Sequence, residues 1–143
     1  MEISIEEVIQ RIDDWKQKEV TYELLGGGIT NHNYKAFVEG ETFVVRIPGA
    51  ETELFIDRDN ELDCSIEAGK TGVAPEVVYH LKPENVSVLR FITAKTLSTD
   101  EIAENNDTVK RIIDSVKTIH NEAVFKKKFD PFETIRKYLD DYV

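Results

Sequence analysis

The chain has 143 residues, of which 41% are hydrophobic and 32% charged, and it carries a formal net charge of −10. This composition is typical of a globular domain, and the acidic balance disfavours nucleic acid as a partner, because proteins that bind nucleic acid usually present a basic face. The one basic run, Lys126 to Lys128, is more typical of a solvated helix end than of a binding patch.

Features that indicate a compartment are few. The sequence has no apolar run that approaches membrane-spanning length, and its acidic, amphipathic start is unlike a signal peptide. The single cysteine, Cys64, excludes an internal disulfide and fits a reducing compartment. We therefore expect a cytoplasmic protein without a membrane partner.

The first half of the chain predicts one helix and three strands. Ser4 and Glu7 have the spacing of a capping box, and the apolar residues that follow share one helical face, so a helix is expected from Ser4 to near Lys18. Alternating apolar residues then predict strands at residues 20–25, 32–39 and 42–47. The short Glu-Gly-Glu segment between the last two strands indicates a hairpin.

The second half begins with another helix, which Asp57 can cap and which ends near Gly72. Two more strands are expected at residues 76–80 and 86–92. The remainder is helical: an apolar stripe runs from Val109 to Ile119, and a last helix opens at Pro131.

The order of these elements predicts an α+β fold with a five-stranded, mostly antiparallel sheet and a covering helix. This order resembles the small lobe of a protein-kinase-like fold, followed by helices that begin a large lobe. The expected boundaries are residues 1–92 for a nucleotide-binding small lobe and 93–143 for the linker and first helices of an incomplete second lobe.

The glycine-rich loop between the first two strands has two interpretations. Glycines let backbone N–H groups approach an anion closely, and Thr30 and Asn31 add side-chain donors, so residues Gly27, Gly28, Thr30 and Asn31 could bind a phosphate. Glycine and asparagine are also favoured in an ordinary hairpin turn. The loop by itself does not separate these two interpretations.

A cation and a carboxylate are the next candidates. Arg46 lies inside an apolar strand, where it must either face solvent or have a partner. Glu61, 15 residues further on, could be that partner from the following helix, with Asp59 and Asp63 as rivals. Arg90 and Ile92 mark the end of the last strand, where a backbone carbonyl and an N–H group could bind adenine.

The motifs GGGITNHNYK, VVRIPG, IDRDNE, GVAPEVVY and LRFI, in this order, resemble those of the choline/ethanolamine kinase family, which is akin to the aminoglycoside phosphotransferases. The resemblance implies ATP-dependent phosphorylation of a small alcohol, choline first. It assigns phosphate contacts to the Gly27–Asn31 loop and Arg46, the pairing role to Glu61, and adenine to the backbone of Arg90 and Ile92. It also implies magnesium in the complete enzyme.

The family's catalytic base is the aspartate of a His-x-Asp loop in a large second lobe, where another acidic motif binds magnesium. The only similar stretch here is His120-Asn121-Glu122, which does not match that pattern. We therefore expect this chain alone to be inactive, to bind nucleotide weakly, and either to self-associate through apolar helix faces or to rearrange its terminal helix. The alternatives are a kinase for another small alcohol, such as an aminoglycoside, or a stand-alone binding or regulatory module on a kinase-like lobe.

Overall fold

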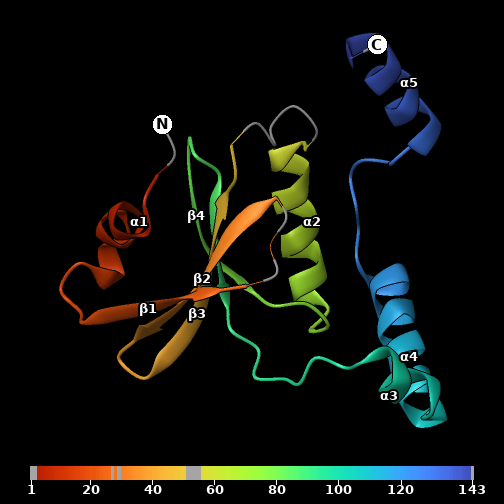
Figure 1. Ribbon diagram of the computed structural model, residues 1–143, viewed down its shortest axis with the longest axis horizontal. Coiled ribbons are helices and arrows are strands. Elements are labelled where there is room, and N and C mark those ends of the chain that lie inside the picture. Colours follow the sequence, from red (N-terminus) through yellow and green to blue (C-terminus); the bar gives the residue numbers. More distant parts are fainter. Residues whose placement is uncertain (1–2, 27, 29, 51–55, 143) are drawn as a thin grey trace.

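The computed structural model describes residues 3–26, 28, 30–50 and 56–142. Its elements, in chain order, are α1 (Ile5–Arg11), η1 (Asp13–Trp15), β1 (Val20–Leu25), β2 (Asn31–Val38), β3 (Glu41–Pro48), α2 (Arg58–Lys70), β4 (Val77–Leu81), β5 (Val86–Arg90), α3 (Thr99–Ala103), α4 (Asn106–Glu122) and α5 (Pro131–Tyr142). The strands form one antiparallel sheet in the order β1-β2-β3-β5-β4, as Figure 1 shows. The α+β architecture expected from the sequence is confirmed.

The first helix is shorter than predicted. The capping box at Ser4 forms, but α1 ends at Arg11, so the expected continuation to near Lys18 is wrong. Ile12 takes an extended backbone conformation (φ −89°, ψ 107°), and a 3-10 turn follows it. This break lets the side chains of Ile12 and Trp15 both reach the sheet, where they are only 3% and 2% exposed.

The hydrophobic core lies between α1 and one face of the sheet. It joins the buried side chains of Ile5, Val8, Ile12, Trp15, Ala36, Val38, Phe43, Val45, Ile47, Val86 and Val88. Successive side chains of a strand point to opposite faces, so Arg46, between the buried Val45 and Ile47, projects from the other face. In Figure 1, α1 and α2 lie on opposite sides of the sheet, and α2 is therefore the helix that Arg46 faces.

The turns and caps mostly follow the sequence pattern. Glu39 and Gly40 both have positive φ angles (48° and 88°), which gives the predicted β2–β3 hairpin the twist of a type I′ turn. Asp57 caps α2 by accepting a 3.0 Å hydrogen bond from a backbone N–H. The last strand ends at Arg90, two residues before the predicted Ile92, where its pairing with β3 ends at Phe43.

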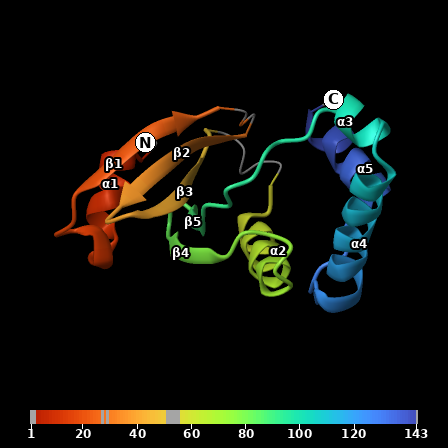
Figure 2. The ribbon, with the colours of Figure 1, turned by 90° about the horizontal axis from the view of Figure 1, so that it is seen from below.

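The C-terminal helices lie beyond α2, on its side away from the sheet, in both Figures 1 and 2. Lysines in the segment between α4 and α5 reach α2: Lys126 Nζ is 2.8 Å from a carboxylate oxygen of Asp63, and Lys127 pairs with Asp57. The apolar faces of α4 and α5 and the segment between them are exposed at Ile112, Ile113, Val116, Val124, Phe125, Phe129, Phe132, Ile135 and Leu139. The self-association expected from these faces stays a prediction. Among the described residues, no helix is both long and apolar enough to cross a membrane.

Candidate functional site

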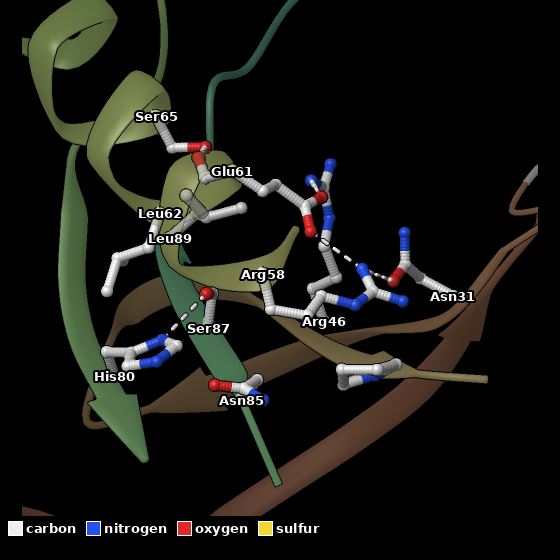
Figure 3. A pocket seen from close by; sticks show the side chains of 11 residues that line it. Asn31, Arg46, Arg58, Glu61, Leu62, Ser65, His80, Asn85, Ser87 and Leu89 are labelled. Carbon is white, nitrogen blue, oxygen red and sulfur yellow. Dashed lines mark hydrogen bonds and ion pairs between the residues drawn. The ribbon is translucent and has the colours of Figure 1, made fainter. Parts of the chain in front are cut away.

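A polar cluster fills the corner between α2 and the sheet face that α1 leaves uncovered. Figure 3 shows its side chains, which come from the start of β2, the end of β3, the first turns of α2, and the β4–β5 hairpin. The lining residues are Asn31, Arg46, Pro48, Arg58, Glu61, Leu62, Ser65, His80, Asn85, Ser87 and Leu89. Three of the residues predicted from the sequence, Asn31, Arg46 and Glu61, therefore meet in one place.

Glu61 is the carboxylate that Arg46 faces. Their closest atoms, Arg46 Nη1 and Glu61 Oε1, are 3.5 Å apart. The rival carboxylates are engaged elsewhere: Asp59 lies 2.6 Å from Lys82, and Asp63 pairs with Lys126. The contact between strand and helix exists as predicted, but 3.5 Å is long for a charge-assisted hydrogen bond.

Arg58 is the closer partner of Glu61, and the sequence analysis gave it no role. Its Nη1 atom lies 2.6 Å from Glu61 Oε2 and 3.2 Å from Asn31 Oδ1. The Arg58 side chain is 6% exposed, whereas that of Arg46 is 38% exposed. The signal was present in the motif IDRDNE, because residues three apart on a helix are neighbours.

The cluster is packed rather than hollow. The space enclosed by its side chains is about 10 Å³, which is room for about one water molecule. Among the described lining residues, two guanidinium groups accompany one carboxylate, so this lining carries excess positive charge. Because the interior is closed, an anion would contact the cluster from its exposed side, where Arg46 lies.

The glycine-rich loop ends beside this cluster. A side chain at Gly28 would meet the backbone oxygen of Asn31 at 2.1 Å and the Asn33 side-chain amide at 2.8 Å, so the loop folds back too tightly for a Cβ atom. The backbone oxygen of Thr30 accepts a 3.0 Å hydrogen bond from the N–H of Gly49, which ties the loop to the end of β3. Gly27, also predicted to contact phosphate, lies outside the described residues.

The residues predicted to contact adenine lie at the other end of the sheet. The Arg90 side chain pairs with Glu41 at 3.0 Å and Glu76 at 3.2 Å on the surface. The Arg90 N–H donates to the backbone oxygen of Glu76 at 2.9 Å. Ile92 lies beyond the strand and is 52% exposed. The polar cluster does not include either residue, and their adenine role stays a prediction.

His80 is the titratable ring of the cluster, and its Nδ1 atom lies 3.1 Å from Ser87 Oγ. Burial, and then the nearby Lys82 cation, lowers the pKa of His80 below its ordinary value of 6.5. Just below pH 6.5 the unfolded chain therefore binds this proton more readily than the folded chain, so the free energy of unfolding falls as the pH falls through that window.

We expect His80→Gln to make the free energy of unfolding less sensitive to acidification from about pH 6.5 to pH 5. Urea denaturation at several pH values measures the slope. The matched control is His120→Gln, at an exposed position on α4. Equal slopes for wild type and His80→Gln would show that burial of this ring does not couple to folding.

The described residues do not include a group of three or more histidine, cysteine, aspartate or glutamate side chains that could hold a metal ion. The polar cluster, with two arginines and one glutamate, is a poor donor set for magnesium, which prefers carboxylate and water oxygens.

Residues 22–143 match the family model described as choline/ethanolamine kinase. The chain belongs to the choline/ethanolamine kinase family. It is 29% identical over 114 residues to protein LicA of Haemophilus influenzae, covering 78% of this chain and 33% of that protein.

Solved structures of this family share the fold. A choline/ethanolamine kinase family protein from Mesorhizobium loti is 31% identical, with a TM-score of 0.74 over 93% of this chain and 43% of that one. LicA solved in complex with AMP is 25% identical, with a TM-score of 0.70 over 93% of this chain and 47% of that one. The chain thus spans less than half the length of these relatives, and it shares the five-stranded antiparallel sheet and helices of their fold.

Proposed function

We propose that this chain is the nucleotide-binding part of a kinase that transfers a phosphoryl group from ATP to choline or ethanolamine. Membership of the family supports the reaction class, and the AMP complex of LicA supports a nucleotide ligand. The observation that carries the proposal is the position of Arg46, a half-exposed cation at the edge of the polar cluster and beside the end of the glycine-rich loop.

This arrangement suits the demands of phosphoryl transfer. The reaction needs phosphates positioned and their charge neutralised, more than it needs covalent help from side chains. In our proposal Arg46 binds a phosphate oxygen of ATP, while Gly27, Gly28, Thr30 and Asn31 contribute backbone and side-chain donors. The adenine would lie toward Arg90 and Ile92, at the other end of the sheet.

The proposal includes the domain organisation of the chain. Residues 1–92 form the nucleotide-binding lobe, and residues 93–143 form a linker and the first helices of a second lobe. We propose that residues 1–143 bind ATP weakly without phosphorylating an alcohol, because the His-x-Asp loop that the family resemblance implies has no match in this sequence. The choice between choline, ethanolamine and another small alcohol belongs to residues outside the polar cluster.

Arg46→Met removes the cation and keeps a similar length of side chain. We expect ATP affinity to fall by about tenfold or more, because a charge-assisted hydrogen bond contributes about 1.5–3 kcal/mol. The free energy of unfolding should change by less than about 1 kcal/mol, since Glu61 retains Arg58 as its closer partner. Isothermal titration with ATP and urea denaturation measure the two quantities.

Arg111→Met, on the exposed side of α4, is the control for loss of one positive charge, and it should leave ATP affinity unchanged. ATP affinity that is equal in wild type and Arg46→Met would contradict the proposed phosphate contact. In that case, binding of another protein with an affinity that does not depend on ATP would favour the stand-alone module instead.

A further inference from the structure

We propose that Arg58 is a positioning residue of the nucleotide site: it joins the end of the glycine-rich loop to α2 and holds Glu61, so that Arg46 is available to a phosphate. Only the availability of Arg46 to a phosphate rests on the proposed function. The contacts between Asn31, Arg58 and Glu61 exist without any nucleotide.

The two arginines differ in how they relate to Glu61. Arg58 approaches the carboxylate to 2.6 Å and is almost fully buried, while Arg46 stays at 3.5 Å and is more than a third exposed. The attraction between opposite charges grows as water is excluded and as the distance shortens. Arg58 therefore determines where the Glu61 carboxylate lies, and the contact with Arg46 is the weaker one.

Arg58 also links two elements that are far apart in the sequence. The Arg58–Glu61 pair lies within α2, with two residues between the partners, so by itself it attaches α2 to nothing. The bond from Arg58 Nη1 to Asn31 Oδ1 crosses to the first residue of β2, 27 positions earlier. Figure 3 shows the Arg58 guanidinium between these two partners.

Because Arg58 is the closer partner of Glu61, the Arg46 guanidinium is only weakly engaged. Its Nε atom is buried without a hydrogen-bond partner among the described residues, and its Nη1 atom has only the long contact to Glu61. The donors that a ligand on the exposed side could use are those of the two Nη atoms, and of these only Nη1 has a described contact, the long one to Glu61. If Arg58 were absent, Glu61 would have Arg46 as its one strong partner and would compete with a phosphate for it.

The first experiment compares ATP with adenosine, which lacks phosphates, on the 143-residue chain. Arg58→Met should lower the affinity for ATP about tenfold, the usual effect of removing one partner from a buried polar network. It should lower the affinity for adenosine less than about twofold. Arg58→Lys keeps the charge and should recover part of the lost ATP affinity. An equal loss for both ligands, as general loosening of the fold would give, overturns the proposal, and so does unchanged ATP affinity.

The second experiment is hydrogen exchange without nucleotide, which stays informative even if the wild-type chain binds no ATP and the proposed function fails. Arg58→Met should speed amide exchange both in the first turns of α2 and at the start of β2. Arg46→Met should change the amide exchange rates in these two segments by no more than about twofold, because the closer Arg58–Glu61 contact persists. If Arg58→Met does not fold, Asn31→Ala replaces it and should speed exchange in the first turns of α2. Exchange at α2 that is unaffected by Asn31→Ala would overturn the proposal.

Discussion

Glu61→Ala is expected to lower the free energy of unfolding by about 3 kcal/mol, because it removes the Glu61 carboxylate from the buried guanidinium of Arg58. Arg58 is 6% exposed and has its closest described contact, at 2.6 Å, with Glu61. Loss of one partner of a buried ion pair costs more than the pair contributed, since the remaining charge stays shielded from water and loses its closest described counter-charge. Urea denaturation at neutral pH measures the change.

The double variant Glu61→Ala/Arg58→Met distinguishes a stranded charge from simple loss of packing. Removing both charges should recover a large part of the lost stability, because replacing a buried ion pair with apolar groups is often nearly neutral. Glu67→Ala, on the same helix, is the matched control: its partner Lys70 is 65% exposed, so no buried cation is left behind. A double variant less stable than Glu61→Ala would contradict this account of the cluster.

Gly28→Ala is the second change with a large expected effect. The added Cβ atom would lie 2.1 Å from the backbone oxygen of Asn31, and a backbone atom cannot move aside as a flexible side chain can. The loop must therefore shift, which should cost about 1–3 kcal/mol of stability and displace the donors proposed to contact phosphate. ATP titration and urea denaturation of the variant measure both effects.

Gly26→Ala supplies an internal control for this loop. A Cβ atom at Gly26 would meet nothing within 4 Å, so the substitution should leave both stability and ATP affinity close to wild type. If Gly26→Ala and Gly28→Ala lose ATP affinity equally, the close approach at Gly28 is not what shapes the loop for phosphate.

Much of the fold is readable from local patterns. The capping residues Ser4 and Asp57, the Glu39-Gly40 turn and the alternating strands all act over a few neighbouring residues, and the structure contains each of them. The predicted continuation of the first helix failed because tertiary packing decided it. Ile12 and Trp15 fit one helical face, but both become buried against the sheet only when the helix breaks at Ile12.

The polar cluster could likewise be predicted from the sequence only in part, because tertiary packing determines some of its contacts. Spacing and residue type pointed to Arg46 and Glu61, and the structure places the two within 3.5 Å. Sequence reasoning gave no role to Arg58, because an arginine at the start of a helix is usually solvent-exposed and only the packing of α2 on the sheet buries it. Its link to Asn31, 27 residues away, depends on that packing and leaves no local pattern in the sequence.

The position of a phosphate relative to Arg46 tests the central claim most directly. A crystal structure of the chain with bound ATP, or with a non-hydrolysable analogue, gives the distance from the Arg46 guanidinium to the nearest phosphate oxygen. We predict about 3 Å, the length of a charge-assisted hydrogen bond, with Glu61 still closer to Arg58 than to Arg46. Nucleotide bound elsewhere on the lobe, with Arg46 turned toward Glu61 alone, would contradict the account.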